Sequence, residues 1–567
     1  MRRPLPVLAL VAACNAAAPA GSDTGSVDET ATSSGAAPST TSGAPTTTGG
    51  ETTGEASSTS TTTTSPTTST TNDASTTDAG TTGAPAIGPR YDQVRQKSAH
   101  NSFQRDESLL DQLVYHRVRS LELDIHHSAS FSAELPGDWY VYHIDVVDDA
   151  SHCRTLSQCL GLVAAFQRAQ PEHEVLTLWL DLKDPFIAGH QPADLDARLL
   201  AALGPALVTP AELLAACPAA TTLQQAVTLP GCGWPELTAL RGRVLVALTG
   251  GDLDQPTTPL ASYIGADASQ RAAFVAPDLT DLAALPAHTE AVFHNLAAAD
   301  VGLAAAVHEA GLVSRVWVLD EAADWIAAEQ AGAQHLASNK VNAAEDPWAS
   351  TAGAGGWPFV CLPGVIDCDE PAREPTPIVA MRVDSGDQWG SADDAMFAHR
   401  PAPGVSALTA LLAVPSSHVE PWAKACLAAR MGLAADAPYL AVCRPADNHP
   451  LAVQFRPTAG ASSKSKDLAQ ISGLDVEAPV FARLELGPDA LCARGLGSAD
   501  GVVWTLIAEQ CFPAPLTHLG LTGSSHDAGE LRLLFADLQL TTEGPLAAAD
   551  FTVTSLGAAT GSVAEGP

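Results

Sequence analysis

The sequence predicts an α/β TIM barrel followed by an all-β jelly-roll sandwich. From Tyr91 to about Pro347, short apolar runs alternate with helical stretches rich in Ala and Leu, a pattern typical of parallel β/α units. Beyond Trp357, helical patterns become rare, and turn residues separate short apolar segments at even spacing, as in a sandwich. The 567 residues exceed the usual domain size of about 100–250 residues, so more than one domain is expected.

The first residues have the pattern of an exported lipoprotein. A basic start precedes an apolar run from Leu5 to Val11, which is far shorter than the ~20 residues needed to cross a bilayer. The sequence VAAC that ends at Cys14 resembles the bacterial lipobox, in which the cysteine is lipid-modified; the alternative is an ordinary secretory signal that contains a cysteine. We predict a lipoprotein signal over residues 1–14 with Cys14 as the lipidation site. Asn15 is not the usual inner-membrane retention residue, so we expect anchoring at the outer membrane or the cell surface.

Residues 15–86 consist mostly of Ser, Thr, Gly, Ala and Pro. Such a composition offers too little apolar surface to bury, so this segment is expected to be a disordered tether between the anchor and the folded part. We place the barrel at residues 87–350, the sandwich at residues 357–545 and a C-terminal tail at residues 546–567.

The charge balance excludes some partners. The chain has 29 Lys and Arg against 64 Asp and Glu, a formal net charge of -35. Nucleic acid binding needs basic patches, so a nucleic acid partner is excluded. Anionic lipid gives this surface no general attraction either, so membrane contact has to rely on the lipid anchor.

Besides Cys14, the chain has ten cysteines, and none forms a CxxC motif. An even number in an exported chain indicates disulfides rather than a zinc site. The pairs nearest in sequence are the natural ones: Cys153 with Cys159, Cys217 with Cys232, and Cys361 with Cys368.

Eight apolar runs are the predicted barrel strands. They are Arg95–Ala99, Ser120–Ile125, Trp139–Ile144, Val175–Leu182, Arg243–Leu248, Ala291–Asn295, Ser314–Leu319 and His335–Ser338.

Polar residues gather at the ends of the first four of these strands. On the second, Glu122, Asp124 and His126 alternate with apolar residues, so they share one face. Active sites of TIM barrels lie at the carboxyl ends of the strands. The set of site candidates is His100, Asn101, Glu122, Asp124, His143, Asp181 and Lys183.

These residue types suit phosphodiester chemistry. Oxygen ligands from Asn101, Glu122, Asp124 and Asp181 suit Ca²⁺, and two histidines can divide proton removal and donation. Lys183 is placed to contact a phosphate oxygen. Taken alone, each residue is as compatible with a structural role as with a functional one. Their recurrence at the ends of four successive strands favours a functional role.

Three segments, SAHNSF at 98–103, LELD at 121–124 and VYH at 141–143, resemble the boxes of phosphatidylinositol-specific phospholipase C. The stretch from Cys153 to Lys183 looks like the bacterial calcium-dependent branch. The resemblance implies that His100 and His143 are the catalytic pair and that Asn101, Glu122, Asp124 and Asp181 hold Ca²⁺.

The resemblance to this family also implies cleavage of the bond between glycerol and phosphate, with the inositol 2-hydroxyl attacking to form a cyclic phosphate. We assign His100 to nucleophile activation and His143 to protonation of the diacylglycerol oxygen. Asp181 departs from the eukaryotic enzymes, which carry Glu there. No Lys/Arg cluster for ring phosphates is evident, so plain phosphatidylinositol or a related glycerophosphodiester is expected rather than a polyphosphorylated form.

The C-terminal part resembles a concanavalin-like jelly roll, for instance in WAKACLAAR at 422–430 and SADGVVWTLIA at 498–508. Such domains often bind glycans, and Trp389, Trp422 and Trp504 are candidate sugar platforms, although each is also compatible with a core position. A purely structural spacer is the alternative.

Two other functions remain open. A glycerophosphodiester phosphodiesterase has the same barrel, but that family usually starts with His-Arg-Gly, whereas Asn101 and Ser102 follow His100 here. A non-catalytic surface glycan-binding protein would be expected to have lost part of the catalytic set.

Overall fold

The structure is a computed structural model of the chain. It describes residues 88–566 except 134, 266, 352–355, 366–367, 369–375, 385, 418, 447–449, 468–479 and 527–528. The predicted signal peptide, Cys14 and the tether lie outside the described residues. Within the described part, no helix combines the length and the apolar character that a membrane span requires.

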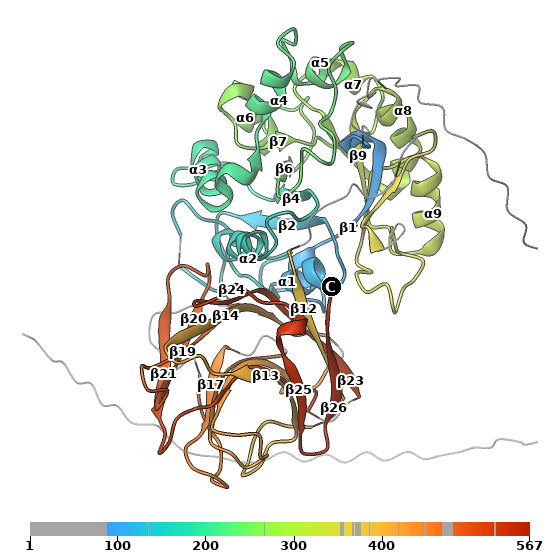
Figure 1. Cartoon of the computed structure of the whole chain (residues 1–567). Coiled ribbons are helices and arrows are strands. Elements are labelled where there is room, and N and C mark those ends of the chain that lie inside the picture. Colours follow the sequence, from blue (N-terminus) through green and yellow to red (C-terminus); the bar gives the residue numbers. More distant parts are fainter. Residues whose placement is uncertain are drawn as a thin grey trace, which may run out of the picture. The chain divides into compact units, whose positions relative to one another are not determined.

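Parallel strands form the barrel (Figure 1). They are β1 (Val94–Ala99), β2 (Ser120–His126), β4 (Leu176–Leu182), β6 (Val244–Thr249), β7 (Phe274–Val275), β8 (Phe293–Ala297), β9 (Val313–Trp317) and β10 (His335–Ser338). The pairing follows this order, and β10 pairs back with β1. Between β7 and β8, a single parallel bridge joins Asp278 to Asn295. The predicted TIM-type barrel is therefore confirmed.

Helices connect these strands. They are α1 (Leu109–Val114), α2 (Leu156–Ala169), α3 (Pro192–Leu203), α4 (Pro210–Ala216), α5 (Leu223–Thr228), α6 (Pro259–Tyr263), α7 (Ala284–Ala287), α8 (Ala304–Glu309) and α9 (Ala322–Gln330). In α2, the Thr155 side chain accepts from the backbone N–H of Gln158, and the Gln158 side chain accepts from that of Thr155. This capping box satisfies backbone donors that a helix start leaves open.

The predicted third barrel strand, Trp139–Ile144, is wrong as a barrel strand. Its paired part is only β3 (Tyr140–Val141), which runs antiparallel to the end of β2. The eighth barrel strand, which was not predicted from the sequence, is β7. A short β5 (Leu207–Val208) also pairs with β6. Two-residue strands leave no periodic pattern in a sequence, so the apolar segment at 139–144 was the stronger signal.

Two antiparallel sheets form the sandwich, as predicted. One has the order β21-β20-β19-β14-β23-β12-β26 and the other β18-β17-β16-β15-β22-β13-β25, while β24 pairs with β23. Their bounds are β12 (Ile378–Asp384), β13 (Ala395–Pro401), β14 (Ser406–Ala413), β15 (Lys424–Arg430), β16 (Tyr439–Pro445), β17 (Ala452–Arg456), β18 (Lys464–Asp467), β19 (Phe481–Leu486), β20 (Cys492–Ser498), β21 (Thr505–Cys511), β22 (His518–Ser524), β23 (Glu530–Leu540), β24 (Gly544–Pro545), β25 (Thr552–Leu556) and β26 (Thr560–Glu565).

The boundaries of the sandwich differ from the prediction. The expected tail at 546–567 contains β25 and β26, which pair with β13 and β12 and so complete one edge of each sheet. At the other end, β11 (Phe359–Cys361) pairs with β1 of the barrel. Because β25 and β26 are rich in Thr, Ser and Gly and largely exposed, they lack the alternation that marks a half-buried strand.

Five disulfides link the ten cysteines of the folded part. The three predicted pairs, 153–159, 217–232 and 361–368, are present. The other two join cross-strand neighbours, Cys426 with Cys443 and Cys492 with Cys511. Each of these two holds adjacent strands of one sheet together.

A buried histidine in the barrel interior predicts acid sensitivity. His335 is fully buried, and its ring nitrogens lie 3.0 Å from the Tyr91 hydroxyl and 2.9 Å from Ser120 Oγ. Burial lowers the pKa of His335 to about 3, below the usual ~6.5. The unfolded chain therefore binds this proton more readily, so this residue's contribution to stability is complete above about pH 6.5 and falls as the pH drops toward 3.

We expect His335→Gln to make the loss of stability between pH 6.5 and 4 shallower, by up to about 1.4 kcal/mol per pH unit. Denaturant unfolding at a series of pH values measures this slope. Equal slopes for the variant and the wild type would contradict the prediction, whatever the change at pH 7.

Candidate active site

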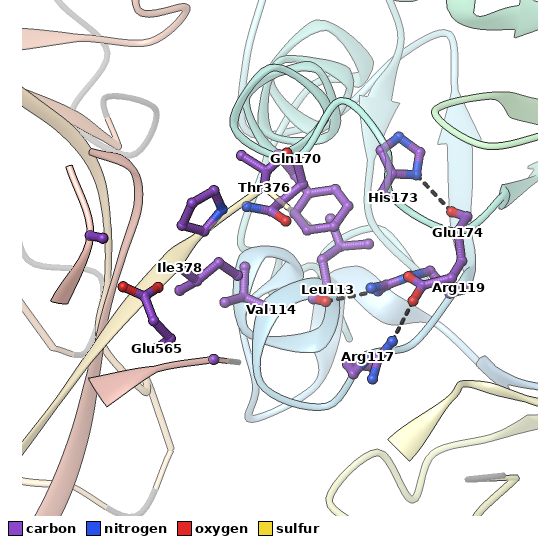
Figure 2. A pocket seen from close by; sticks show the side chains of 14 residues that line it. Leu113, Val114, Arg117, Arg119, Gln170, His173, Glu174, Thr376, Ile378 and Glu565 are labelled. Carbon is purple, nitrogen blue, oxygen red and sulfur yellow. Dashed lines mark hydrogen bonds and ion pairs between the residues drawn. The ribbon is translucent and has the colours of Figure 1, made fainter. Parts of the chain in front are cut away.

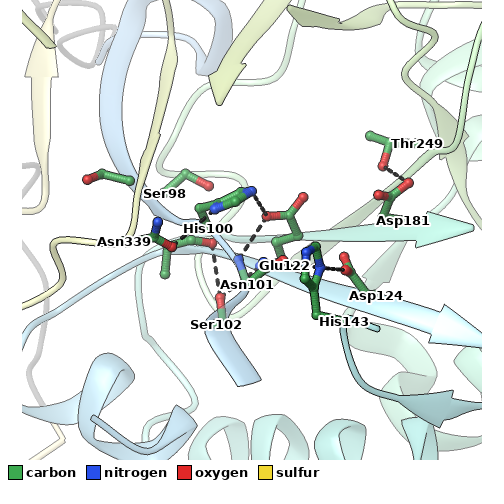
Figure 3. A network of polar contacts seen from close by, with 12 residues as sticks. Ser98, His100, Asn101, Ser102, Glu122, Asp124, His143, Asp181, Thr249 and Asn339 are labelled. Carbon is green, nitrogen blue, oxygen red and sulfur yellow. Dashed lines mark hydrogen bonds and ion pairs between the residues drawn. The ribbon is translucent and has the colours of Figure 1, made fainter. Parts of the chain in front are cut away.

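The first site residues lie on a turn directly after β1. Asn101 adopts a left-handed conformation with φ 47°, which Asn tolerates better than most residues. Its backbone N–H donates to Glu122 Oε2 at 2.9 Å. This bond ties the turn to β2 and places His100 and Asn101 beside the carboxylates (Figure 3).

Three carboxylates come together at the carboxyl ends of β2 and β4. Glu122 and Asp124 share one face of β2, and the parallel register sets Asp124 opposite Asp181. One oxygen of each of the three acids lies within 4.8 Å of the others. The shared face inferred from the alternating sequence therefore produces a real cluster.

Glu122 is compensated by a buried cation. Arg315 on β9, 1% exposed in its side chain, places Nη2 2.7 Å from Glu122 Oε2. Burial would raise the pKa of Glu122, but the Arg315 guanidinium holds the pKa below its usual value. Arg315 also donates to Asn295 Oδ1 at 2.9 Å, which fixes the guanidinium.

The charged form of Asp124 is disfavoured relative to that of Glu122. Its side chain is fully buried, and burial raises its pKa although His143 opposes the shift. Lys183 Nζ lies 3.2 Å from Asp124 Oδ2 and also pairs with Asp181. Asp124 Oδ1 is buried and has no hydrogen-bond partner among the described residues. An oxygen in that state indicates room for a further cation at the site.

A chain of polar contacts orients His100. The Asn339 amide donates through Nδ2 to Asp320 Oδ2 at 2.5 Å, and its backbone N–H donates to Asp320 Oδ1 at 2.7 Å. Asn339 Oδ1 therefore faces His100 Nδ1 at 3.1 Å. Because an amide oxygen only accepts, Nδ1 carries the proton. The lone pair of Nε2 is left facing the carboxylates, 3.8 Å from Glu122 Oε2.

His143 has a different partner. Its Nδ1 lies 2.8 Å from Asp124 Oδ2 and 3.4 Å from Asn101 Nδ2. The hydrogen bond with Asp124 raises the pKa of His143 above its usual value, although burial works against it. Its side chain is 32% exposed, so the ring can meet a substrate.

His126 does not join the cluster, although it shares the alternating pattern with Glu122 and Asp124. Its ring stacks on Tyr142 with centroids 3.9 Å apart. Its Nε2 lies 3.1 Å from Tyr142 O and its Nδ1 3.4 Å from Asp184 Oδ2. At this end of β2, His126 is paired with Tyr140 of β3.

Four residues of the site were missed in the sequence: Thr249, which donates to Asp181 at 3.0 Å, and Arg315, Asp320 and Asn339. Arg315 lies inside β9, and the other three follow the carboxyl ends of β6, β9 and β10 or lie at them. The available signal was a polar residue within or directly after an apolar run.

A cavity of about 450 Å³ lies away from this cluster, between α1, α2 and the start of β12 (Figure 2). Its lining is mainly apolar, and Arg117 and Arg119 both pair with Glu174, with Arg119 Nε 2.8 Å from Glu174 Oε2. It contains none of the predicted site residues.

One family model matches part of the chain. Residues 130–292 match the family described as "Phosphoinositide phospholipase C, Ca2+-dependent". This segment includes His143, Asp181, Lys183 and Thr249, whereas His100, Asn101, Glu122 and Asp124 precede it. No curated protein matches the sequence.

Several solved structures are similar to part of the chain. A calcium-dependent phosphoinositol-specific phospholipase C from a Pseudomonas species is 22% identical, with a TM-score of 0.41, covering 48% of this chain and 96% of its own. The corresponding enzyme from Streptomyces antibioticus is 19% identical, with a TM-score of 0.38 and coverage of 46% and 97%. A glycerophosphodiester phosphodiesterase from Parabacteroides distasonis is 11% identical, with a TM-score of 0.28 and coverage of 45% and 97%.

The residues present fit the cofactor of the matched family. Ca²⁺ takes oxygen ligands, and the site offers three clustered carboxylates, one of which has a buried oxygen without a partner. The family match over residues 130–292 confirms the predicted resemblance to Ca²⁺-dependent phospholipase C.

Proposed function

We propose that the barrel cleaves the glycerol–phosphate bond of phosphatidylinositol-type lipids and releases a cyclic inositol phosphate. The observation that carries this proposal is the pair of histidines on either side of the carboxylate cluster, each held by a different partner through Nδ1. Such an arrangement allows one ring to accept a proton while the other donates one.

His100 is the proposed base. With its proton held on Nδ1 by Asn339, Nε2 can take the proton of the inositol 2-hydroxyl as that oxygen attacks phosphorus. The aromatic ring of Trp317 lies stacked beside His100, with centroids 6.2 Å apart and planes 16° apart. Packing of this kind limits the ring to one orientation, which general-base catalysis requires.

His143 is the proposed acid. Its raised pKa favours the protonated ring near neutral pH. As the bond between phosphorus and the glycerol oxygen breaks, His143 Nε2 gives its proton to that oxygen, and diacylglycerol leaves. Asp124 stabilises the positive ring before transfer through the bond to Nδ1.

Asn101, Glu122, Asp124 and Asp181 are the proposed Ca²⁺ ligands. When bound, the ion neutralises phosphate charge and lowers the pKa of a hydroxyl that contacts it. Lys183, whose ammonium lies against Asp124 and Asp181, is proposed to contact a phosphate oxygen of the substrate.

An exposed apolar turn beside His143 supports a membrane lipid as substrate. Ile144 and Asp148 exchange backbone hydrogen bonds of 3.0 and 2.8 Å, so the intervening residues project at a tight turn. Val146 and Val147 are 74% and 81% exposed, and Val146 has φ 68°. A β-branched residue in this conformation is strained, and large exposed apolar groups mark interaction surfaces.

Other exposed apolar residues of the barrel also lie in connections after strands. Ile187 follows β4, Leu282 follows β7 and Val318 follows β9. These connections belong to the carboxyl ends of the strands, where the site lies. We propose that this apolar rim, with the predicted Cys14 lipid anchor and the 15–86 tether of an exported protein, brings the barrel to the lipid surface.

The first test measures the products formed from phosphatidylinositol vesicles by the full chain. We expect a cyclic inositol phosphate, and we expect His100→Ala and His143→Ala each to lower kcat by about 10²–10⁴-fold, the usual contribution of acid–base catalysis. Hydrolysis of glycerophosphodiesters instead of this lipid would overturn the substrate assignment, and no hydrolysis of either would overturn the proposed function.

The metal site can be tested without substrate. We expect Ca²⁺ to raise the Tm of the wild-type protein, because a ligand that binds only the folded state stabilises it, and we expect Asp124→Asn to abolish this shift. Glu309→Gln, at an exposed carboxylate on α8, is the matched control. An undiminished shift in Asp124→Asn would exclude Asp124 as a ligand.

The apolar turn predicts a surface-specific defect. Val146→Asp with Val147→Asp should lower hydrolysis of vesicles by about tenfold or more, because each buried Val contributes about 1.5–3 kcal/mol. Hydrolysis of a soluble short-chain substrate should fall far less. Val502→Asp with Val503→Asp, at two exposed valines of the sandwich, is the control. Equal losses on both substrates would contradict a role at the membrane.

A further inference from the structure

The helix α1 begins a few residues after the turn at the end of β1. We call residues 100–102, which include His100 and Asn101, the β1 turn. The helix has six residues, all of them buried. Isolated helices shorter than about 12 residues are marginal in water, and the first N–H groups of a helix have no partner within it. The position of α1 therefore depends on the segments that pack against it and on the groups that cap it.

The sandwich supplies part of the packing around α1. Apolar residues of the helix share one buried cluster with residues of β12, β14 and β23; from α1 these are Leu109, Leu110, Leu113 and Val114. At the end of the helix, the Tyr115 hydroxyl lies 2.8 Å from Ala413 O and 3.0 Å from Arg532 O. Trp504, one of the candidate sugar platforms, packs against the same cluster, which favours its alternative role as a core residue. The barrel and the sandwich therefore share a core at α1.

The start of α1 has the first half of a capping box. Ser108 is the N-cap residue, and its hydroxyl accepts from the backbone N–H of Asp111 at 3.3 Å. In an ordinary capping box, a Glu or Gln three residues later reaches back to the N-cap N–H. Asp111 stands at that position, but its side chain is a methylene shorter than that of Glu. The Ser108 N–H donates instead to Ser416 Oγ, at 2.9 Å.

Ser416 completes this box from the sandwich. It lies in the connection between β14 and β15. Its Oγ accepts from the Ser108 N–H and donates to Asp111 Oδ2, and its backbone N–H donates to the same oxygen at 2.5 Å. A hydroxyl can accept and donate at the same time, so Ser416 bridges the two groups that Asp111 alone does not join. Asp111 is 1% exposed, and a carboxylate buried without such bonds would be costly.

Gln112 connects the capped helix to the β1 turn. It is fully buried, and its amide Nε2 donates to Ser102 O at 2.7 Å and to Glu107 O at 2.8 Å. Ser102 is the last residue of the β1 turn, next to Asn101 (Figure 3). Its hydroxyl accepts from the backbone N–H of Glu122 at 2.8 Å. The side chain that holds the β1 turn from below therefore comes from α1, directly after the residue that Ser416 binds.

We propose that Ser416 is a positioning residue for the β1 turn. By completing the cap of α1, it fixes Gln112, whose amide holds Ser102 O and with it the turn that carries His100. A misplacement of about 1 Å at reacting groups can cost on the order of 10²-fold in rate. The sandwich thus supports the reaction of the barrel without contact with the substrate. Only the kinetic part of the test rests on the function proposed for the barrel.

The first test needs no substrate and measures hydrogen exchange in the full chain. In Ser416→Ala, the backbone amides of residues 100–112 should exchange about fivefold faster or more, because a lost cap destabilises the helix start by about that factor. Ser416→Thr keeps a hydroxyl and should exchange as the wild type does. Ser417→Ala is the matched control, since Ser417 Oγ lies 3.3 Å from Glu107 Oε1, outside the capping box. Unchanged exchange in Ser416→Ala, or an equal rise in Ser417→Ala, would overturn the proposal.

The second test separates positioning from stability by kinetics on phosphatidylinositol. Well below its Tm, Ser416→Ala should lower kcat by about fivefold or more and change KM by less than about twofold, because the reacting groups move while substrate contacts remain. Tyr115→Phe removes a contact at the other end of α1 and is the control for lost stability. It should lower Tm without a comparable fall in kcat. An unchanged kcat in Ser416→Ala, or equal falls in both variants, would exclude a positioning role.

A double-mutant cycle tests the path through Gln112. If Ser416 acts through this amide, Ser416→Ala should lower kcat far less in a Gln112→Ala background than in the wild type. Additive losses would contradict the path. If Gln112→Ala does not fold, Ser416→Thr decides the question: we expect kcat of the wild-type level, and a loss equal to that of Ser416→Ala would overturn the role of the hydroxyl. If the wild-type chain does not hydrolyse this lipid, the function proposed for the barrel fails, and hydrogen exchange alone decides whether Ser416 holds the β1 turn.

Discussion

Glu122 and Asp124 lie two residues apart on one strand, almost without contact with solvent. Burying a carboxylate without compensation costs several kcal/mol, so the barrel mouth has to supply countercharges. Arg315 and the Asn101 N–H do so for Glu122, and Lys183 and His143 do so for Asp124. These partners come from the ends or the interiors of four different strands. The site and the closure of the barrel therefore depend on each other.

The two histidines of the site differ in the partner that each has at Nδ1. His143 lies against an acid and is driven toward the charged form. His100 lies against a neutral amide whose orientation Asp320 fixes, and its Nε2 keeps a lone pair. Arg315 adds to this by holding Glu122 in the charged form, so that the nearby bases face a fixed negative charge.

Much of this site follows from local sequence, and the rest depends on pairing that no local pattern contains. Period-2 alternation correctly predicted that Glu122 and Asp124 share a face, and the parallel register then brought Asp181 opposite Asp124. The same alternation placed His126 with these acids, but its ring stacks on Tyr142 and lies near Asp184 instead.

Arg315 shows why part of the site could not be predicted from local sequence. Its partner Glu122 is almost two hundred residues away in sequence, and only the ring order of β9, β10, β1 and β2 brings the two together. Apart from its charge, nothing in the run VSRVW separates a buried partner from a surface residue. The two-residue β7 was missed for a related reason, since a strand that short is defined by its neighbour β6 and not by its own residues.

The large negative charge of the chain and an anionic lipid substrate are compatible only if contact does not rely on attraction between charges. At physiological ionic strength, repulsion between surface charges is screened beyond about 8 Å, whereas burial of an exposed Val contributes about 1.5–3 kcal/mol at contact. Val146 and Val147 stand next to His143, at the point where approach matters most. In the proposed function, the exposed Val146 and Val147 beside the site take the role that a basic surface would otherwise have.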